Sequence, residues 1–152
     1  FMKSNSLPAV IIIENNDWSL ATKTNERRAN IDFDKFANSL DVEYLHLQGN
    51  DPFKYQREIK LLREKALQER TPVLCEVKLV TLGHWHMDHA DFPDGKFINY
   101  HGGPAPEVQE MEYPLLETSS NDPLFVLKQY LPIDELIKMS NELTSLLKEE
   151  IK

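Results

Sequence analysis

The most pronounced pattern along the chain is a run of apolar residues that ends abruptly in polar ones. Residues 9–13 read Ala-Val-Ile-Ile-Ile, and Glu14, Asn15 and Asn16 follow at once. An unbroken, mostly β-branched run between a proline and an Asn pair predicts a strand covered on both faces, as in parallel α/β sheets. Such sheets bind ligands at the carboxyl ends of their strands, where we expect both asparagines to lie.

The asparagine pair is open to two interpretations. Amide oxygens are hard, neutral donors that suit Mg²⁺ or Ca²⁺, so Asn15 and Asn16 are candidate metal ligands. An Asn-Asn pair is also common in polar turns, because asparagine tolerates left-handed backbone geometry, and the local sequence favours this interpretation. The metal-ligand interpretation stays open.

Four further elements alternate between helix and strand after this run. Apolar residues at helical spacing, behind an aspartate that can cap them, predict a short amphipathic helix over 32–40. A brief strand over 42–47 precedes a long surface helix over 52–70, for which Asp51 is the expected cap. A second sheet strand is predicted over 73–80, half exposed towards its far end. The order strand, helix, strand, helix, strand predicts an α/β layer structure with right-handed crossovers.

Two stretches show no sustained periodicity and are interpreted as loops, over 17–31 and 81–116. The second holds four of the five histidines and four of the five glycines, and a loop of this length in a compact protein is usually functional or disordered. Beyond it, Asp122 followed by a proline begins a predicted helix, and an amphipathic helix runs from Pro132 to the carboxyl terminus. We expect a single domain over 1–152.

Composition and charge narrow the classes of function. The 152 residues are 41% hydrophobic, enough for one domain with a real core. The formal charge of −8 argues against a nucleic-acid surface, and the single cysteine, Cys75, excludes an intrachain disulfide. No apolar run approaches the ~20 residues that span a bilayer, and residues 1–6 lack the apolar core of a signal peptide. These features predict a cytoplasmic protein without a membrane partner.

A cluster of metal-binding residue types stands inside the second loop. His84, His86, Asp88 and His89 follow the spacing His-x-His-x-Asp-His, which resembles the first metal-binding motif of the metallo-β-lactamase family and would suit zinc. That family needs further ligands well beyond the motif, and His101 is the one histidine that follows. A zinc-dependent hydrolase fragment and a solvated polar loop with adventitious metal affinity are both open.

Segments along the whole chain resemble a different family. Residues 7–22, with Glu-Asn-Asn followed by an aromatic residue and a small-polar turn, look like the second half of the thiamine diphosphate motif. That motif occurs in alpha subunits of the first component of 2-oxo acid dehydrogenase complexes. Four further segments match this family in order, and they are Gly49-Asn50-Asp51-Pro52, Thr71-Pro72-Val73-Leu74-Cys75-Glu76, Leu82-Gly83-His84, and Asn121-Asp122-Pro123-Leu124 with Tyr130-Leu131.

The resemblance implies a fold, two cofactors and a set of site residues. The implied fold is a partial thiamine diphosphate-binding fold, with three layers, a mainly parallel sheet flanked by helices, and carboxyl-terminal helices. The implied cofactors are thiamine diphosphate and Mg²⁺, with the side chain of Asn16 and the backbone carbonyl of Trp18 as metal ligands. His84 matches the loop histidine near the diphosphate and the reaction centre, where an imidazole can donate to phosphate or move a proton.

The resemblance also implies a reaction and partners. The reaction is oxidative decarboxylation of a 2-oxo acid, as in pyruvate dehydrogenase, with transfer of the acyl group to a lipoyl carrier. The implied partners are a beta subunit or fused beta domain and the lipoyl acyltransferase component, in a homo- or hetero-oligomer. The compartment would be the mitochondrial matrix if the source is eukaryotic.

Departures from the family pattern matter as well. The Gly-Asp-Gly half of the cofactor motif should precede Leu7 and is absent, so we expect the carboxyl-terminal portion of a longer polypeptide, inactive alone, with an exposed sheet edge. Trp85 stands where the family commonly has serine. His86 and His89 have no clear counterpart, and the divergent stretch 92–113 leaves the choice of 2-oxo acid open. A catalytically incomplete interaction domain is a further alternative.

Overall fold

The computed structural model describes the chain from residue 1 to residue 151 with several gaps. The described residues are 1–19, 22–80, 82, 85–98, 109, 111 and 113–151, with backbone alone for 85–89 and 92–98.

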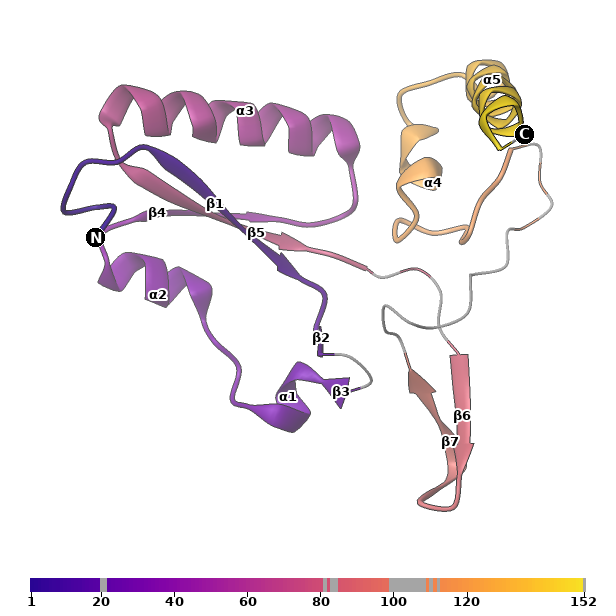
Figure 1. Cartoon of the computed structure of the whole chain (residues 1–152), viewed down its shortest axis with the longest axis horizontal. Coiled ribbons are helices and arrows are strands. Elements are labelled where there is room, and N and C mark those ends of the chain that lie inside the picture. The colour runs from indigo at the N-terminus through magenta and orange to yellow at the C-terminus, as the bar shows by residue number, and fades with distance from the viewer. Residues whose placement is uncertain are drawn as a thin grey trace.

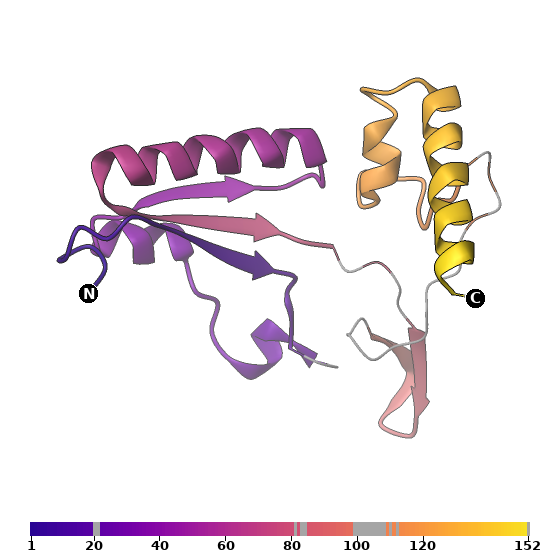
Figure 2. The ribbon, with the colours of Figure 1, turned by 45° about the horizontal axis from the view of Figure 1, so that its top comes forward.

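A three-stranded parallel sheet with a helix on each face forms the first half of the molecule. The strands lie in the order β1 (Ala9–Asn15), β5 (Pro72–Lys78), β4 (Glu43–Leu47). The chain therefore moves two places across the sheet from β1 to β4 and one place back to β5. Right-handed crossovers in opposite directions put the connecting helices on opposite faces. Figures 1 and 2 show α3 (Pro52–Glu69) over one face and α2 (Phe33–Ser39) over the other. The predicted three-layer α/β arrangement is confirmed.

Aspartates fix the beginning of both helices, as the sequence predicts. The side chain of Asp32 accepts a hydrogen bond from the backbone N–H of Lys35 at 3.0 Å, and that of Asp51 accepts one from Lys54 at 3.0 Å. Each bond satisfies one of the N–H groups that a helix leaves without an internal partner. Pro52 occupies the first helical position, where a missing N–H costs nothing.

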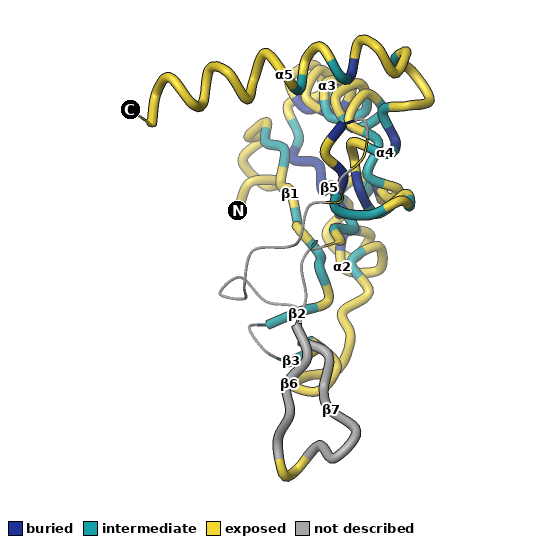
Figure 3. The backbone as a smooth tube through the Cα atoms, turned by 90° about the vertical axis from the view of Figure 1, so that its right-hand side faces the viewer, coloured by how far each residue is buried: buried dark blue, intermediate teal, exposed yellow. Residues whose placement is uncertain are grey.

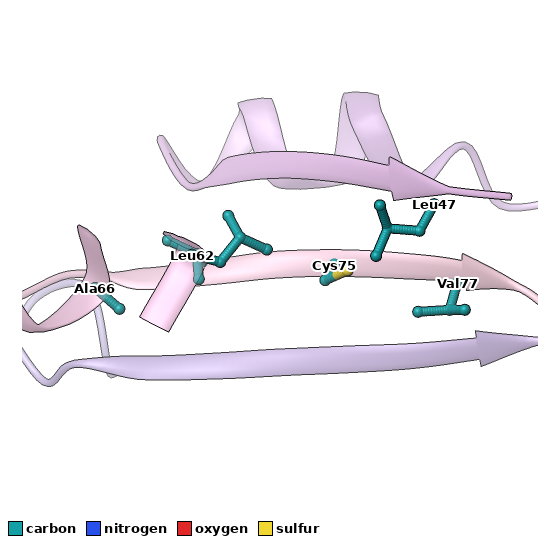
Figure 4. Close-up of a cluster of buried hydrophobic side chains, with 6 residues drawn as sticks. Leu47, Leu62, Ala66, Cys75 and Val77 are labelled. Carbon is teal, nitrogen blue, oxygen red and sulfur yellow. The ribbon is translucent and has the colours of Figure 1, made fainter. Parts of the chain in front are cut away.

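The main hydrophobic core lies between the sheet and α3. Val73 and Cys75 are completely buried on the central strand, and Leu62 and Ala66 reach them from the helix (Figure 4). Full burial of a Val or Leu side chain stabilises the fold by roughly 1.5–3 kcal/mol. The pairing of β1 and β4 with this central strand sets their register and thereby where the carboxyl ends of the strands meet.

The burial of β1 differs from its prediction, and that of β5 agrees with it. β1 was expected to be covered on both faces, but it lies at the sheet edge, where Ile11 and Ile12 are 39% and 46% exposed. β5 is the central strand and is buried over Pro72–Val77, whereas Lys78 and Leu79 are half-buried and Val80 is exposed, so the predicted exposure of 73–80 towards its far end is confirmed. An apolar run favours a buried strand, but it does not determine whether other elements of the same chain cover both of its faces. The expectation of a partial sheet with an exposed edge is confirmed.

The segment after β1 has more structure than the predicted loop. Trp18–Ser19 (β2) pairs antiparallel with Thr22–Lys23 (β3), and one helical turn, α1 (Thr24–Arg27), follows. The backbone N–H of Thr24 donates to the carbonyl of Asp17 at 2.7 Å, which closes this small hairpin against the end of β1. Elements of two to four residues are too short to produce a periodic pattern.

The stretch 81–116 is also not an unstructured loop throughout. Trp85–His89 (β6) pairs antiparallel with Phe92–Ile98 (β7), with an irregularity in register between Met87 and His89. The hairpin projects away from the sheet in Figure 1. Its strands lack apolar alternation, which is the signal that predicts a strand, so the sequence did not reveal it. The assignment of 81–116 as an active-site loop stays a prediction.

Two helices close the chain and form a second, smaller core. Asp122 caps α4 (Pro123–Leu127), and α5 (Ile133–Glu150) follows Pro132, as predicted. Leu136 is buried at the beginning of α5, whereas the second half of this helix is exposed along its whole circumference (Figure 3). None of the helices in the described part of the chain has a stretch long and hydrophobic enough to span a bilayer.

The helical unit is anchored to the beginning of α3. The Tyr130 hydroxyl donates to the Asp51 carboxylate, and its ring packs edge-on against Phe53 with the ring centroids 5.3 Å apart. The Asn50 side-chain amide donates to the backbone carbonyls of Ser120 and Asn121 at 3.1 and 2.9 Å. Two of the segments that the family resemblance brought out, 49–52 and 121–131, therefore meet in space.

Candidate functional site

An open pocket of about 510 Å³ lies where β1 and β5 end. The two strands are parallel and in register, with Asn15 opposite Lys78, so the residues that follow both strands meet at one edge of the sheet. This is the place where parallel α/β sheets bind ligands. The pocket walls include Asn16, Asp17 and Trp18 after β1, Lys23 on β3, and Lys78 with Leu79 at the end of β5.

The asparagine pair forms a tight turn at the pocket. The side-chain oxygen of Asn15 accepts from the backbone N–H of Asp17 at 3.2 Å, and that of Asn16 accepts from the N–H of Trp18 at 3.0 Å. Asp17 takes the left-handed conformation, with φ of +63°. The turn interpretation is confirmed, and Asp17 rather than an asparagine adopts the unusual backbone geometry.

The two asparagines have different remaining capacities for a ligand. The Asn15 amide is used at both ends, because its Nδ2 also donates to Glu76 Oε1 at 2.6 Å. Asn16 lines the pocket, and its Oδ1 accepts the Trp18 N–H alone among the hydrogen bonds of the described residues. An amide oxygen carries two lone pairs, so Asn16 can coordinate a cation while it keeps the turn bond.

Two lysines add positive charge to the same walls. Lys78 Nζ forms an ion pair with the Asp17 carboxylate across the ends of β1 and β5. Lys23 Nζ lies 6.0 Å from the centroid of the Trp18 ring, at the outer limit of a cation–π contact. The sequence did not indicate that Lys23 and Lys78 line a pocket. The alternation of apolar and polar residues shows which face of a strand is buried, but it does not show what lies next to the end of the strand.

The donors at the pocket suit a magnesium diphosphate group. Mg²⁺ prefers oxygen ligands and usually shares its coordination between a few protein groups, phosphates and water. Asn16 Oδ1 offers one such oxygen, and Trp18, whose backbone carbonyl was the second predicted ligand, lies on the same wall. Lys23 and Lys78 could compensate phosphate charge. The residue types that line the pocket therefore fit the implied cofactors, since phosphate oxygens and water can supply the remaining ligands of the ion.

A buried carboxylate lies directly behind the turn. Glu76 is 9% exposed at the centre of the sheet and accepts from Asn15 Nδ2 on one side and from the Tyr44 hydroxyl, at 2.5 Å, on the other. Burial and the bond to this carboxylate raise the pKa of Tyr44, so its hydroxyl stays protonated and donates. The sequence showed Glu76 as part of a family segment but gave no sign of these partners.

The histidine cluster is described in part. His84, the predicted catalytic and cofactor-binding residue, lies outside the described residues. His86, Asp88 and His89 lie on β6, where the backbone alone is described. Within the residues that the structure describes, no group of three or more His, Cys, Asp or Glu is placed to hold a metal. His101 also lies outside the described residues, so the roles of the histidines stay predictions.

Part of this chain is similar in sequence to alpha subunits of 2-oxoisovalerate dehydrogenase. The alpha subunit of mitochondrial 2-oxoisovalerate dehydrogenase from Dictyostelium discoideum is 27% identical over 85 residues, which cover 55% of this chain and 19% of that protein. The mitochondrial 2-oxoisovalerate dehydrogenase subunit alpha 1 from Arabidopsis thaliana is 27% identical over 77 residues, which cover 51% of this chain and 16% of that protein. A protein of Arabidopsis thaliana named putative 2-dehydropantoate 2-reductase is 27% identical over 77 residues, which cover 51% of this chain and 21% of that protein.

The chain thus matches about a fifth of the length of these curated relatives. No solved structure matches it. Nothing in the comparisons supports the zinc-hydrolase alternative. The sequence family described as "Dehydrogenase E1 component" matches residues 1–93, which include the whole parallel sheet and the pocket at its edge. Since this match covers more than half of the chain, the chain belongs to the dehydrogenase E1 component family.

Proposed function

We propose that this chain is part of the alpha subunit, or alpha domain, of a thiamine diphosphate-dependent 2-oxo acid dehydrogenase. The reaction would be oxidative decarboxylation of a 2-oxo acid with transfer of the acyl group to a lipoyl carrier. The observation that carries the proposal is the pocket at the ends of β1 and β5, which brings Asn16 and Trp18 together with two lysines inside the region that the family match covers.

Each pocket residue receives a role that its chemistry allows. Asn16 Oδ1 and the Trp18 carbonyl would bind Mg²⁺, and the ammonium groups of Lys23 and Lys78 would face the diphosphate. His84 would exchange a proton near the reacting carbon or donate to the diphosphate, as the family resemblance implies. When bound, thiamine diphosphate supplies the electron sink that decarboxylation of a 2-oxo acid requires.

The active form would be an assembly. We propose that this chain alone is inactive, because it matches only about a fifth of the length of its curated relatives. A beta subunit or fused beta domain would complete the site, and a lipoyl acyltransferase would receive the acyl group. Two relatives carry mitochondrial names, which supports the mitochondrial matrix as the compartment in a eukaryotic source.

The test is cofactor binding to the full-length alpha and beta assembly. Titration calorimetry with thiamine diphosphate at saturating Mg²⁺ should give stoichiometric binding. Asn16→Ala should weaken it by about tenfold or more, because a ligand to a charged group contributes roughly 1.5–3 kcal/mol. The matched control is Asn25→Ala, an exposed asparagine on the same pocket that has no assigned role.

Three outcomes would contradict the proposal. The assembly could fail to bind thiamine diphosphate at any Mg²⁺ concentration. Asn16→Ala could bind as well as the wild type, which would remove its assigned role. Stoichiometric zinc in protein purified without added metal would favour the hydrolase alternative instead.

A further inference from the structure

Glu76 connects all three strands of the sheet to the turn that borders the pocket. Its carboxylate accepts from Tyr44 on β4 at 2.5 Å and from Asn15 on β1 at 2.6 Å, while it lies on the central strand β5. We propose that Glu76 is a positioning residue, which sets the conformation of the Asn15–Trp18 turn through the side-chain amide of Asn15.

The argument begins with the burial of the carboxylate. Glu76 is 9% exposed, and a buried carboxylate is costly unless it is hydrogen-bonded. Any two hydrogen-bond donors would satisfy a buried carboxylate. In this sheet the donors are Asn15 on β1 and Tyr44 on β4, the two strands that flank β5. Both bonds are short, at 2.6 Å and 2.5 Å, and breaking either would leave a buried polar atom without its partner.

The chemistry of the carboxylate decides the orientation of Asn15. Both oxygens of Glu76 accept, Oε1 from Asn15 and Oε2 from Tyr44, so the Asn15 amide turns its nitrogen towards this carboxylate. Its oxygen then points the other way, where it accepts from the backbone N–H of Asp17 at 3.2 Å. The opposite orientation would place two oxygens against each other and two N–H groups against each other. Glu76 thus selects the single orientation that supports the turn.

The turn needs such support because its backbone is strained. Asp17 has a φ of +63°, and a residue other than glycine keeps this conformation only when its surroundings impose it. The Asn15–Asp17 bond precedes Asn16, whose own side-chain bond to the Trp18 N–H continues the turn. A change at Glu76 should therefore alter the geometry of Asn16 and Trp18. None of the side-chain hydrogen bonds of the described residues joins Glu76 directly to either of them.

Backbone hydrogen exchange in the full-length assembly tests this inference without any cofactor. In Glu76→Leu, which keeps similar volume but cannot accept, the amides of Asp17 and Trp18 should exchange about tenfold faster than in the wild type. The matched control is Tyr44→Phe, which removes the other hydrogen bond of the same carboxylate. It should leave exchange in the turn within about twofold of the wild type. Equal acceleration in both variants would show a structural role alone and overturn the inference.

A second variant keeps the test decisive if Glu76→Leu does not fold. Asn15→Asp retains an oxygen that can accept from Asp17 but has no N–H to offer Glu76. If Glu76 sets the turn, this variant should also accelerate exchange of the turn amides about tenfold. Exchange at the wild-type rate would mean that the local turn bond suffices, which contradicts the inference.

Cofactor affinity gives a separate readout that rests on the proposed function. Glu76→Leu should weaken Mg²⁺-dependent binding of thiamine diphosphate about tenfold, and Tyr44→Phe should not. If the wild-type assembly binds no thiamine diphosphate, the proposed function fails, while the exchange experiment still decides the role of Glu76. If it binds and both variants match the wild type, the turn does not control the ligands and this inference fails alone.

Discussion

Replacement of Asp122 should selectively destabilise the two carboxyl-terminal helices. This side chain is 1% exposed and accepts three backbone N–H groups, from Leu116 at 2.7 Å, Glu117 at 3.2 Å and Leu124 at 2.8 Å. It therefore caps α4 and also holds the chain that enters the helical unit. Most helix caps carry out the first of these tasks alone.

The size of the effect follows from these three bonds. An Asp-to-Ala change at an ordinary cap costs about 1 kcal/mol. Here two further N–H groups in partly buried positions lose a charged acceptor, and each such loss costs roughly 1–3 kcal/mol. We expect Asp122→Ala to lower the free energy of unfolding of this unit by about 3–7 kcal/mol, a large fraction of the stability of a typical domain.

Urea unfolding of the full-length protein, with hydrogen exchange over α5 as the local probe, measures this change. The matched control is Asp32→Ala, because Asp32 is an exposed cap that accepts one backbone N–H, from Lys35. This control should cost about 1 kcal/mol and leave α5 unaffected. A loss below about 1 kcal/mol in Asp122→Ala, or equal losses in the two variants, would refute the reasoning from the three bonds.

Two further predictions concern the pocket and the sheet. Lys78→Met should weaken thiamine diphosphate binding by roughly tenfold at low salt, and the difference from the wild type should shrink as the salt concentration rises. The control Lys60→Met, on the exposed side of α3, should leave the affinity unchanged at every salt concentration. An unchanged affinity of Lys78→Met in calorimetry would contradict the role of Lys78. Tyr44 has a raised pKa in the folded protein, from burial first and then from Glu76, so the neutral hydroxyl stabilises the fold below its ordinary pKa of about 10, and this stability is lost as pH rises further. Urea midpoints should therefore fall more steeply above pH ~10 in the wild type than in Tyr44→Phe, and parallel curves would argue against it.

The exposed edge of β1 adds a structural condition to the proposed function. Ile11 and Ile12 are largely accessible, and an apolar edge strand of this kind readily pairs with another chain. The curated relatives extend over several times the length matched here. Activity therefore has to be measured in the full-length assembly, and the pocket described above is a property of the part that this chain contributes.

The sequence by itself determined the elements and the family. Capping aspartates, a proline at the first helical position and apolar spacing are local signals, so α2, α3, α4 and α5 lie where the pattern predicts them. The alternation of strands and helices also predicted the parallel, layered arrangement. Asn16 and Trp18 came from a family motif, and the structure does place them on one pocket.

The tertiary structure alone decided which strand is central and which partners the polar residues have. β5 lies between β1 and β4 because the second crossover returns, and no periodicity in the sequence encodes that direction. Only this order buries Glu76 between Asn15 and Tyr44, and only the parallel register sets Lys78 against Asp17. The two hairpins also escaped prediction, because β2 and β3 have two residues each and β6 and β7 lack apolar alternation. Contacts between residues some 30 to 60 positions apart arise from packing, which local sequence signals cannot specify.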